Sequence, residues 1–100
     1  MSDEIRADYE QLEQVASQFA SQAEAIQEML QTVRSSMDKL EDDGWIGRGS
    51  DAFFGEMHDE VLPAVLRLYD ALMDGSQVTK DIVQTMQEAE EDASSPFRAQ

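Results

Sequence analysis

The chain has 100 residues, the size of one domain, and carries 22 acidic and 7 basic side chains, for a net charge of −15 at pH 7. Nucleic acid and anionic membrane surfaces repel such a polyanion, so neither is expected as a partner, and its field favours basic proteins. The sequence contains no cysteine, which excludes disulfides and thiolate metal sites.

The first residues, MSDEIRADYEQL, are acidic and have a helical pattern. A secretory signal would instead need a basic stretch followed by an apolar core of about 7–15 residues. The longest uncharged run, residues 14–23, is half polar and too short to span a membrane, so stable membrane insertion is not expected. If the protein leaves the cell, it requires a route that handles folded helices.

A regular apolar repeat predicts a first helix over residues 4–42. Apolar side chains recur in alternating steps of four and three, the spacing of a heptad. Asp3 and Glu4 place negative charge at the start of this helix, Lys39 lies in its last turn, and Gly44 follows where a left-handed C′ residue is expected. The predicted buried face consists of Ile5, Tyr9, Leu12, Ala16, Phe19, Ala23, Ile26, Leu30, Val33, Met37 and Leu40.

A second, weaker repeat predicts another helix over residues 51–92, for which Ser50 or Asp51 would be a good N-cap. Pro63 lies inside it and should bend it, because proline lacks the amide hydrogen and its ring clashes with the preceding turn. The predicted buried face of this helix consists of Phe54, His58, Val61, Val65, Leu68, Leu72, Gly75, Thr79, Ile82, Met86 and Ala89.

The segment Asp-Gly-Ser at residues 74–76 offers an alternative, a break that would give a three-helix bundle. The four-three phase passes through Gly75 unbroken, whereas a turn would normally reset it, so one continuous helix is favoured. At the other end, Glu90, Glu91 and Asp92 oppose the helix dipole, and residues 93–100 are expected to form a flexible tail.

The apolar residues of the second helix occupy more than one face. Leu62, Leu66, Tyr69 and Met73 form a further row, with a thinner counterpart in Val15 and Met29 on the first helix. A two-helix hairpin cannot cover such a row by itself, and an exposed apolar strip of this length is typical of an association site. The predicted fold is therefore all-α, an antiparallel two-helix hairpin that dimerises into a four-helix bundle.

The turn between the helices, residues 43–50, contains the only tryptophan of the chain, Trp45. Gly44, Gly47 and Gly49 supply the backbone freedom that a short reversal needs. Trp45 has two interpretations: a hydrophobic cap over the ends of both helices, or a recognition element, since a partly exposed tryptophan on a rigid turn is a good binding anchor.

The combination of about a hundred residues, two amphipathic helices and Trp45-x-Gly47 in the central turn resembles the Trp-x-Gly family of small type VII secretion substrates, the ESAT-like proteins, over residues 4–92. This resemblance implies export without a cleaved signal by a membrane machine with a hexamer-forming ATPase. It also implies a folded homodimer, or a heterodimer with a paralogous Trp-x-Gly protein. In the family, the turn of one subunit and the C-terminal arm of the other form a composite export signal, to which Trp45 and Gly47 correspond.

The family's C-terminal arm commonly carries Tyr, three residues, then Asp or Glu. Here that spacing occurs only at Tyr9 and Glu13, at the opposite end of the chain. Met86 and Glu90 form a looser match in the expected place, and are the candidate C-terminal export motif. Because this arm differs from the family's usual pattern, the sequence leaves open which secretion subtype exports the protein, and whether the C-terminal signal lies in this chain or in a partner.

No catalytic constellation is evident in the sequence, and no cofactor or metal site is expected. His58 is the only histidine, and its neighbours one helical turn away offer no second ligand, so it is expected to pack along the buried face. Gly-Trp-Ile-Gly-Arg-Gly follows a helix rather than a strand, unlike a phosphate loop or a dinucleotide-binding fingerprint. The protein is therefore expected not to be an enzyme.

Two functional hypotheses follow. The first is a secreted type VII helical-hairpin dimer that acts as effector, adaptor or export partner, made in the cytoplasm and found outside the cell. The alternative is a cytosolic acidic interaction module or charge mimic. A charge mimic does not require the Trp45-x-Gly47 turn and should concentrate its acidic residues on one face, whereas here they flank both apolar faces.

Leu66→Asp tests the predicted dimer, because a charge placed in the apolar row should weaken association. Sedimentation at tens of micromolar should show a dimer for the unaltered protein and a shift toward monomer for Leu66→Asp. A monomer before substitution would refute the prediction.

Overall fold

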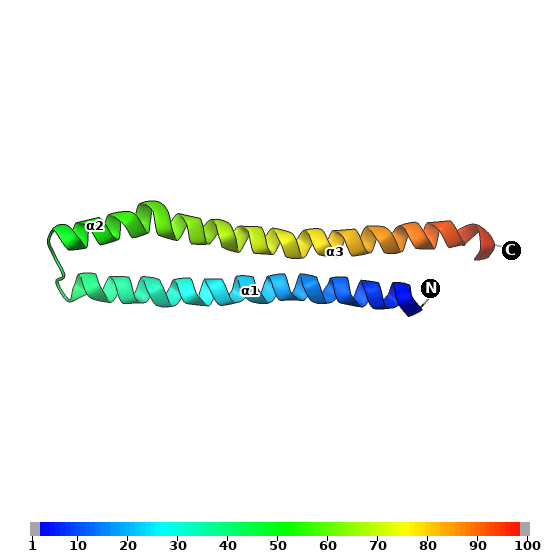
Figure 1. Ribbon diagram of the computed structural model, residues 1–100, viewed down its shortest axis with the longest axis horizontal. Helices are drawn as coiled ribbons and strands as arrows, with labels where there is room; N and C mark the ends of the chain where they lie inside the picture. The colour runs from blue at the N-terminus through cyan, green and yellow to red at the C-terminus, as the bar shows by residue number, and fades with distance from the viewer. Residues whose placement is uncertain (1–2, 99–100) are drawn as a thin grey trace. The chain divides into compact units, whose positions relative to one another are not determined.

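The computed structural model describes the backbone of residues 3–98, together with the side chains of residues 4 and 6–93. This part of the chain is helical on both sides of a single turn at residues 43–47, and it contains no strand (Figure 1). The elements are α1 (Asp3–Asp42), α2 (Arg48–Glu56), a π-helical turn η1 (Met57–Val61) and α3 (Leu62–Arg98). The predicted all-α helical hairpin is confirmed. None of the helices between residues 3 and 98 is long and apolar enough to cross a membrane.

The chain divides into two compact units. One comprises Ser21–Leu72, in which the end of α1 reverses through the turn into α2, η1 and the beginning of α3. This unit is the hairpin tip and contains Trp45. The other comprises Met1–Ala20 and Met73–Gln100, in which the beginning of α1 pairs with the remainder of α3.

The unit that contains the turn has an apolar core of large side chains. Leu30, Met37 and Leu62 are buried at its centre. Around them pack six partly buried residues: Ile26, Val33, Phe53, Phe54, Met57 and Val65. Burial of such side chains, at about 25 cal/mol per Å² of apolar surface, is the main force that holds the hairpin closed.

The other unit buries one large side chain, Tyr9, and several smaller ones. Ala16, Ser76 and Val83 are buried in it. Gly75 faces the ring of Phe19, and a Cβ atom added at Gly75 would lie 3.3 Å from the ring carbons Cδ1 and Cε1. Small residues allow helices to approach closely, which explains why a glycine is accommodated in the middle of α3 despite its poor helix propensity.

The predicted buried face of α1 agrees with the structure at nearly every position. Its heptad positions alternate between buried residues (Tyr9, Ala16, Ala23, Leu30, Met37) and half-buried residues (Leu12, Phe19, Ile26, Val33). Leu40, in the last turn, is exposed, and the side chain of Ile5 lies outside the described residues. The heptad spacing of α1 therefore predicts correctly which of its side chains are buried.

Pro63 is associated with a π turn, visible in Figure 1 as the widened coil between α2 and α3. The amide of Leu62 donates to the carbonyl of Met57, five residues back, rather than four. In a regular α-helix the ring of Pro63 would clash with the carbonyl of Asp59, which would also lack its amide partner. A wider turn just before the proline relieves that conflict. The bend that the sequence predicts at Pro63 therefore takes the form of a π turn.

The π turn changes which face of the second helix is buried. The interior position moves from Met57 to Leu62, a step of five, and the four-three steps then continue through Val65, Tyr69, Leu72, Ser76, Thr79 and Val83, all buried or half-buried. The predicted face, drawn with no such step, is correct at Phe54, Val65, Leu72, Gly75 and Thr79. It is wrong at His58, Val61, Leu68, Ile82, Met86 and Ala89, which are exposed. For the same reason, Leu62 and Tyr69 lie on the interior side of the helix and do not belong to the predicted association row.

The end of α3 differs from its expected position. The helix passes through Gly75 without a break, which confirms the continuous second helix and excludes the three-helix alternative. It continues to Arg98, so the backbone of residues 93–98 is helical where the sequence predicts a tail after residue 92. Unfavourable dipole interactions of exposed acids cost only about 0.3–1 kcal/mol each, which is too little to end a helix. That these residues are flexible stays a prediction.

Substitutions at Gly75 and Gly55 should separate helix propensity from packing. A Cβ atom added at Gly55 in α2 would meet open space, whereas at Gly75 the Phe19 ring lies 3.3 Å away. Gly55→Ala should therefore stabilise the protein by about 1 kcal/mol. Gly75→Ala should gain less, and Gly75→Leu should destabilise by about 1–3 kcal/mol through overpacking.

These free energies of unfolding can be measured by urea denaturation. In a background of Phe19→Leu, the gain in stability from Gly75→Ala should rise toward that from Gly55→Ala, because the aromatic ring that lies close to position 75 is replaced by a smaller side chain. Equal gains at the two glycines in the unaltered background would contradict the packing argument.

Candidate recognition site at the interhelical turn

The C-terminus of α1 ends in a Schellman motif that places Trp45. The amide of Gly44 donates to the carbonyl of Glu41 at 3.0 Å, and the amide of Trp45 donates to the carbonyl of Leu40 at 3.2 Å. Gly44 has a φ of +83°, which confirms the left-handed C′ residue expected from the sequence. Trp45 is therefore attached to the helix by its own backbone, and its direction is set where α1 ends.

The start of α2 is set by Gly47. This residue is the N-cap, with φ 118° and ψ −171°, a region of backbone space that only glycine adopts readily. The amide of Asp51 donates to the Gly47 carbonyl at 3.0 Å. The prediction that Ser50 or Asp51 is the N-cap is wrong, because the glycine backbone allows the helix to begin earlier, at Arg48.

Ser50 instead connects the two sides of the turn. Its side chain is buried, and its hydroxyl donates to the carbonyl of Trp45 at 3.0 Å. This bond satisfies a carbonyl that has left α1 and has no place in α2. Trp45 is thus held by its amide to the first helix and by its carbonyl to the second.

The Trp45 ring belongs to an aromatic cluster with Phe53 and Phe54 of α2. Its centroid lies 5.5 Å from that of Phe53 and 5.7 Å from that of Phe54, and the two phenylalanine rings meet edge to face at 5.2 Å. Such separations are typical of favourable aromatic pairs. Even so, Trp45 remains 40% exposed. The ring therefore caps the core on one side and offers a surface to solvent on the other.

Ile46 protrudes from this turn. It is 86% exposed, the most exposed large apolar side chain of those described. The sequence pattern draws attention to Trp45 and Gly47 and does not distinguish Ile46, because the middle residue of a Trp-x-Gly turn can be of any type. The pattern does not predict Phe53 and Phe54 as part of the site either. The signal that could have found them is a pair of aromatic residues in the helix that follows the motif.

Charge around the turn is predominantly acidic. Between residues 39 and 51 there are four acidic side chains (Glu41, Asp42, Asp43 and Asp51) and two basic ones (Lys39 and Arg48), so the local formal charge is −2. All six side chains are exposed. The apolar side chains of the turn are therefore flanked in the sequence by an excess of exposed acidic residues.

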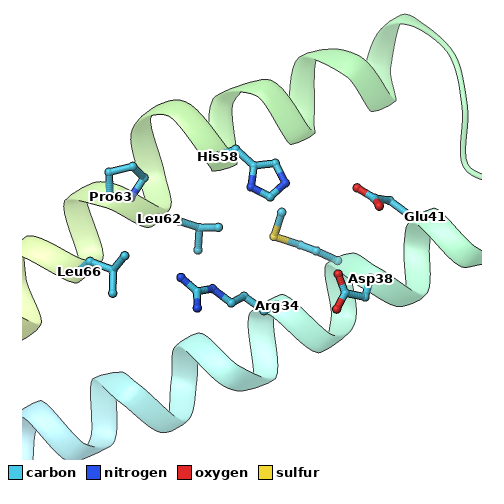
Figure 2. A pocket seen from close by; sticks show the side chains of 8 residues that line it. Arg34, Asp38, Glu41, His58, Leu62, Pro63 and Leu66 are labelled. Atoms are coloured by element: carbon cyan, nitrogen blue, oxygen red, sulfur yellow. The ribbon is translucent and has the colours of Figure 1, made fainter.

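A pocket of about 370 Å³ lies beside the π turn, between α1 and the second helix (Figure 2). Its apolar lining includes Leu62 and Leu66, and its polar lining includes Arg34, Asp38 and His58. In Figure 2, His58 and Leu62 point toward α1, and Arg34 extends from α1 toward Leu62. Within the described residues, no three His, Cys, Asp or Glu side chains are grouped so as to hold a metal ion.

His58 does not pack along the buried face as expected. It lies in η1, is exposed, and its ring is stacked on Phe54 with centroids 6.4 Å apart and an interplanar angle of 24°. The half-buried position next to it is Met57, and His58 lies at the side, where it lines the pocket. His58 thereby extends the aromatic cluster of Trp45, Phe53 and Phe54 along the second helix.

The candidate C-terminal motif lies in the unit that does not contain the turn. Met86 is exposed and Glu90 is half-buried. The Tyr9 hydroxyl is buried and has no hydrogen-bond partner of good geometry among the described residues. Burial, followed by the nearby Glu90 carboxylate, raises the pKa of Tyr9. Glu90 thus faces α1 and is only partly available to a partner.

The predicted association row is retained only in part. Leu66, Met73, Val15 and Met29 are exposed large apolar side chains, as an interface requires. Leu62, by contrast, is 6% exposed and belongs to the core of its own unit, and Tyr69 is half-buried. Further exposed large apolar side chains of α3 are Leu68, Val78 and Ile82.

Comparison with known proteins identifies a family for this chain. The WXG100 family, described as proteins of 100 residues with WXG, matches the sequence over residues 4–91. No curated protein and no solved structure matches the chain. The matched range contains the whole turn and the Met86–Glu90 segment.

Gly47→Ala should destabilise the turn, because an L-residue is strained at a φ of 118°. The expected loss is about 1–3 kcal/mol in the free energy of unfolding. Gly49→Ala is the matched control: it lies nearby in α2, where an added Cβ would meet only Trp45 Cζ2 at 3.9 Å, an ordinary contact. Gly49→Ala should be neutral or slightly stabilising. Thermal or urea denaturation of both variants measures the difference, and similar losses would show that the backbone of Gly47 is not the determinant.

Proposed function

Because the chain belongs to the WXG100 family, we propose that it is a substrate of a type VII secretion system, exported folded and acting through protein–protein contacts. Small helical Trp-x-Gly proteins of this kind operate in the context of that system and are not known as enzymes. Effector, adaptor and export partner are the roles open to it. Its proposed location after export is extracellular, without removal of a signal peptide.

The geometry of Trp45 carries this proposal. The residue is fixed through both of its backbone groups, rests on Phe53 and Phe54, and still exposes part of its ring. A rigid aromatic side chain loses little conformational entropy on binding, which makes it an efficient anchor. A side chain that served only to cap the core would be better buried.

We further propose that the protein travels as a dimer, with itself or with a paralogous Trp-x-Gly protein. Exposed Leu66 and Met73 on α3, with Val15 and Met29 on α1, support this proposal. Leu66 and Met29 lie in the unit that contains the turn, and Met73 and Val15 lie in the other, so each unit exposes large apolar side chains that a partner could cover. The secretion ATPase is the proposed second partner.

The test is expression in the native cell, with and without the ATPase of the secretion system, followed by measurement of the protein in cell and culture fractions. Export that depends on the ATPase, with no mass change beyond removal of Met1, is the expected result. Retention inside the cell despite an active machine would overturn the proposal and favour a cytosolic acidic interaction module.

Trp45→Ala should impair export while leaving the helix content of the protein nearly unchanged. Since much of the ring is already exposed, its loss should lower the free energy of unfolding by only about 1–2 kcal/mol. Phe53→Ala is the matched control, because it loosens the same aromatic cluster but keeps the exposed tryptophan. Circular dichroism and urea denaturation measure the fold, and the culture fraction measures export. Equal loss of export in both variants would indicate that Trp45 acts only by capping the core.

A further inference from the structure

We propose that Ile46 is a docking residue of the turn, and that it enters an apolar pocket with a basic rim on the protein that receives this turn during export. The inference rests on the proposed function and deepens it, because it names the side chain that makes the contact and the chemistry of the partner's surface. Trp45 and Gly47 then also hold Ile46 in place, and the exposed part of the Trp45 ring lies next to it in the chain.

Exposure distinguishes Ile46 from every other apolar residue of the turn. It is 86% exposed, whereas Trp45 is 40% exposed and the rings of Phe53 and Phe54 are partly buried. Its side chain adds almost nothing to the packing of its own chain, so protein stability does not explain an isoleucine here. Burial in a partner would remove nearly the whole side chain from water.

Hydrogen bonds hold the residues on both sides of Ile46, which favours its use as a docking residue. On its N-terminal side, the amide of Trp45 is bonded to the Leu40 carbonyl. The carbonyl of Trp45, in the peptide unit that joins it to Ile46, accepts from Ser50. On its C-terminal side, Gly47 begins α2. The two residues that flank Ile46 are therefore held by α1 and α2, and little entropy is lost when it binds.

The surrounding charge identifies the kind of partner. Asp42 and Asp43 precede the turn, Asp51 follows it, and all three carboxylates are exposed. Arg48 is the one basic residue between Asp43 and Asp51. An apolar side chain flanked in the sequence by exposed carboxylates complements an apolar pocket with lysine or arginine at its edge, and such charges accelerate association and exclude acidic partners. A second copy of this acidic turn is a poor match for the same reason.

Export measured in the native cell tests the inference with three variants at or near the turn. Ile46→Ser should lower the ratio of exported to retained protein by about tenfold or more, since it removes a fully buried apolar contact. Ile46→Val keeps most of that contact and should stay within about threefold of the unaltered protein. Ala52→Ser, an exposed apolar-to-polar change in α2, controls for an added hydroxyl nearby and should have no effect.

A fourth variant, Asp42→Asn with Asp43→Asn, removes two flanking charges without changing their shape. It should reduce export by several-fold, because the carboxylates of Asp42 and Asp43 would no longer attract the basic residues at the edge of the partner's pocket. Thermal unfolding and sedimentation of the purified variants accompany the export measurement. Ile46→Ser should match the unaltered protein in both.

Several results would overturn the inference. Normal export of Ile46→Ser would show that nothing receives this side chain. A change in oligomeric state for Ile46→Ser would show that a second copy covers it instead. Equal defects for Ile46→Ser and Ala52→Ser would make the effect nonspecific. Failure of the unaltered protein to be exported would overturn the proposed function as well, which separates that outcome from the others.

Discussion

Pro63 has no amide hydrogen, and the arrangement of the second helix depends on how the chain accommodates this. The answer is a π turn over Met57–Val61, closed by the bond from the Leu62 amide to the Met57 carbonyl. One additional residue in that turn places Met57 on the interior side before it and Leu62 on the interior side after it. The core of the unit that contains the turn is therefore assembled across an irregular helix, and His58 is left at its edge.

In the turn at the end of this unit, hydrogen bonds of the backbone set where each helix ends or begins, and side chains then connect the two helices. The Schellman motif ends α1, and the glycine N-cap starts α2, so neither helix end uses a capping side chain. Ser50 is thereby free to bond the Trp45 carbonyl, and the Trp45 ring rests on Phe53 and Phe54. These contacts explain why Trp45 and Gly47 occur together: the first residue bridges the helices, and the second permits the backbone to reach α2.

In this arrangement, the Trp-x-Gly motif can stabilise the turn and bind a partner at the same time. One side of the Trp45 ring packs on Phe53 and Phe54, while the rest of the ring and Ile46 are exposed, with acidic residues before and after them in the sequence. The proposed contact with the export machinery uses that outer surface. The proposed dimer would instead use exposed apolar residues of α1 and α3.

The sequence by itself determined the helices, the position of the turn, the buried face of α1 and the family, because heptad spacing, glycine placement and Trp45-x-Gly47 are local signals. Only the tertiary structure decided the face of the second helix, the start of α2 at Arg48 and the roles of Ser50, Ile46 and His58. The physical reason is that a proline shows where a helix is disturbed but not how many residues the disturbed turn contains. A single residue more or less changes which side chains reach the interior.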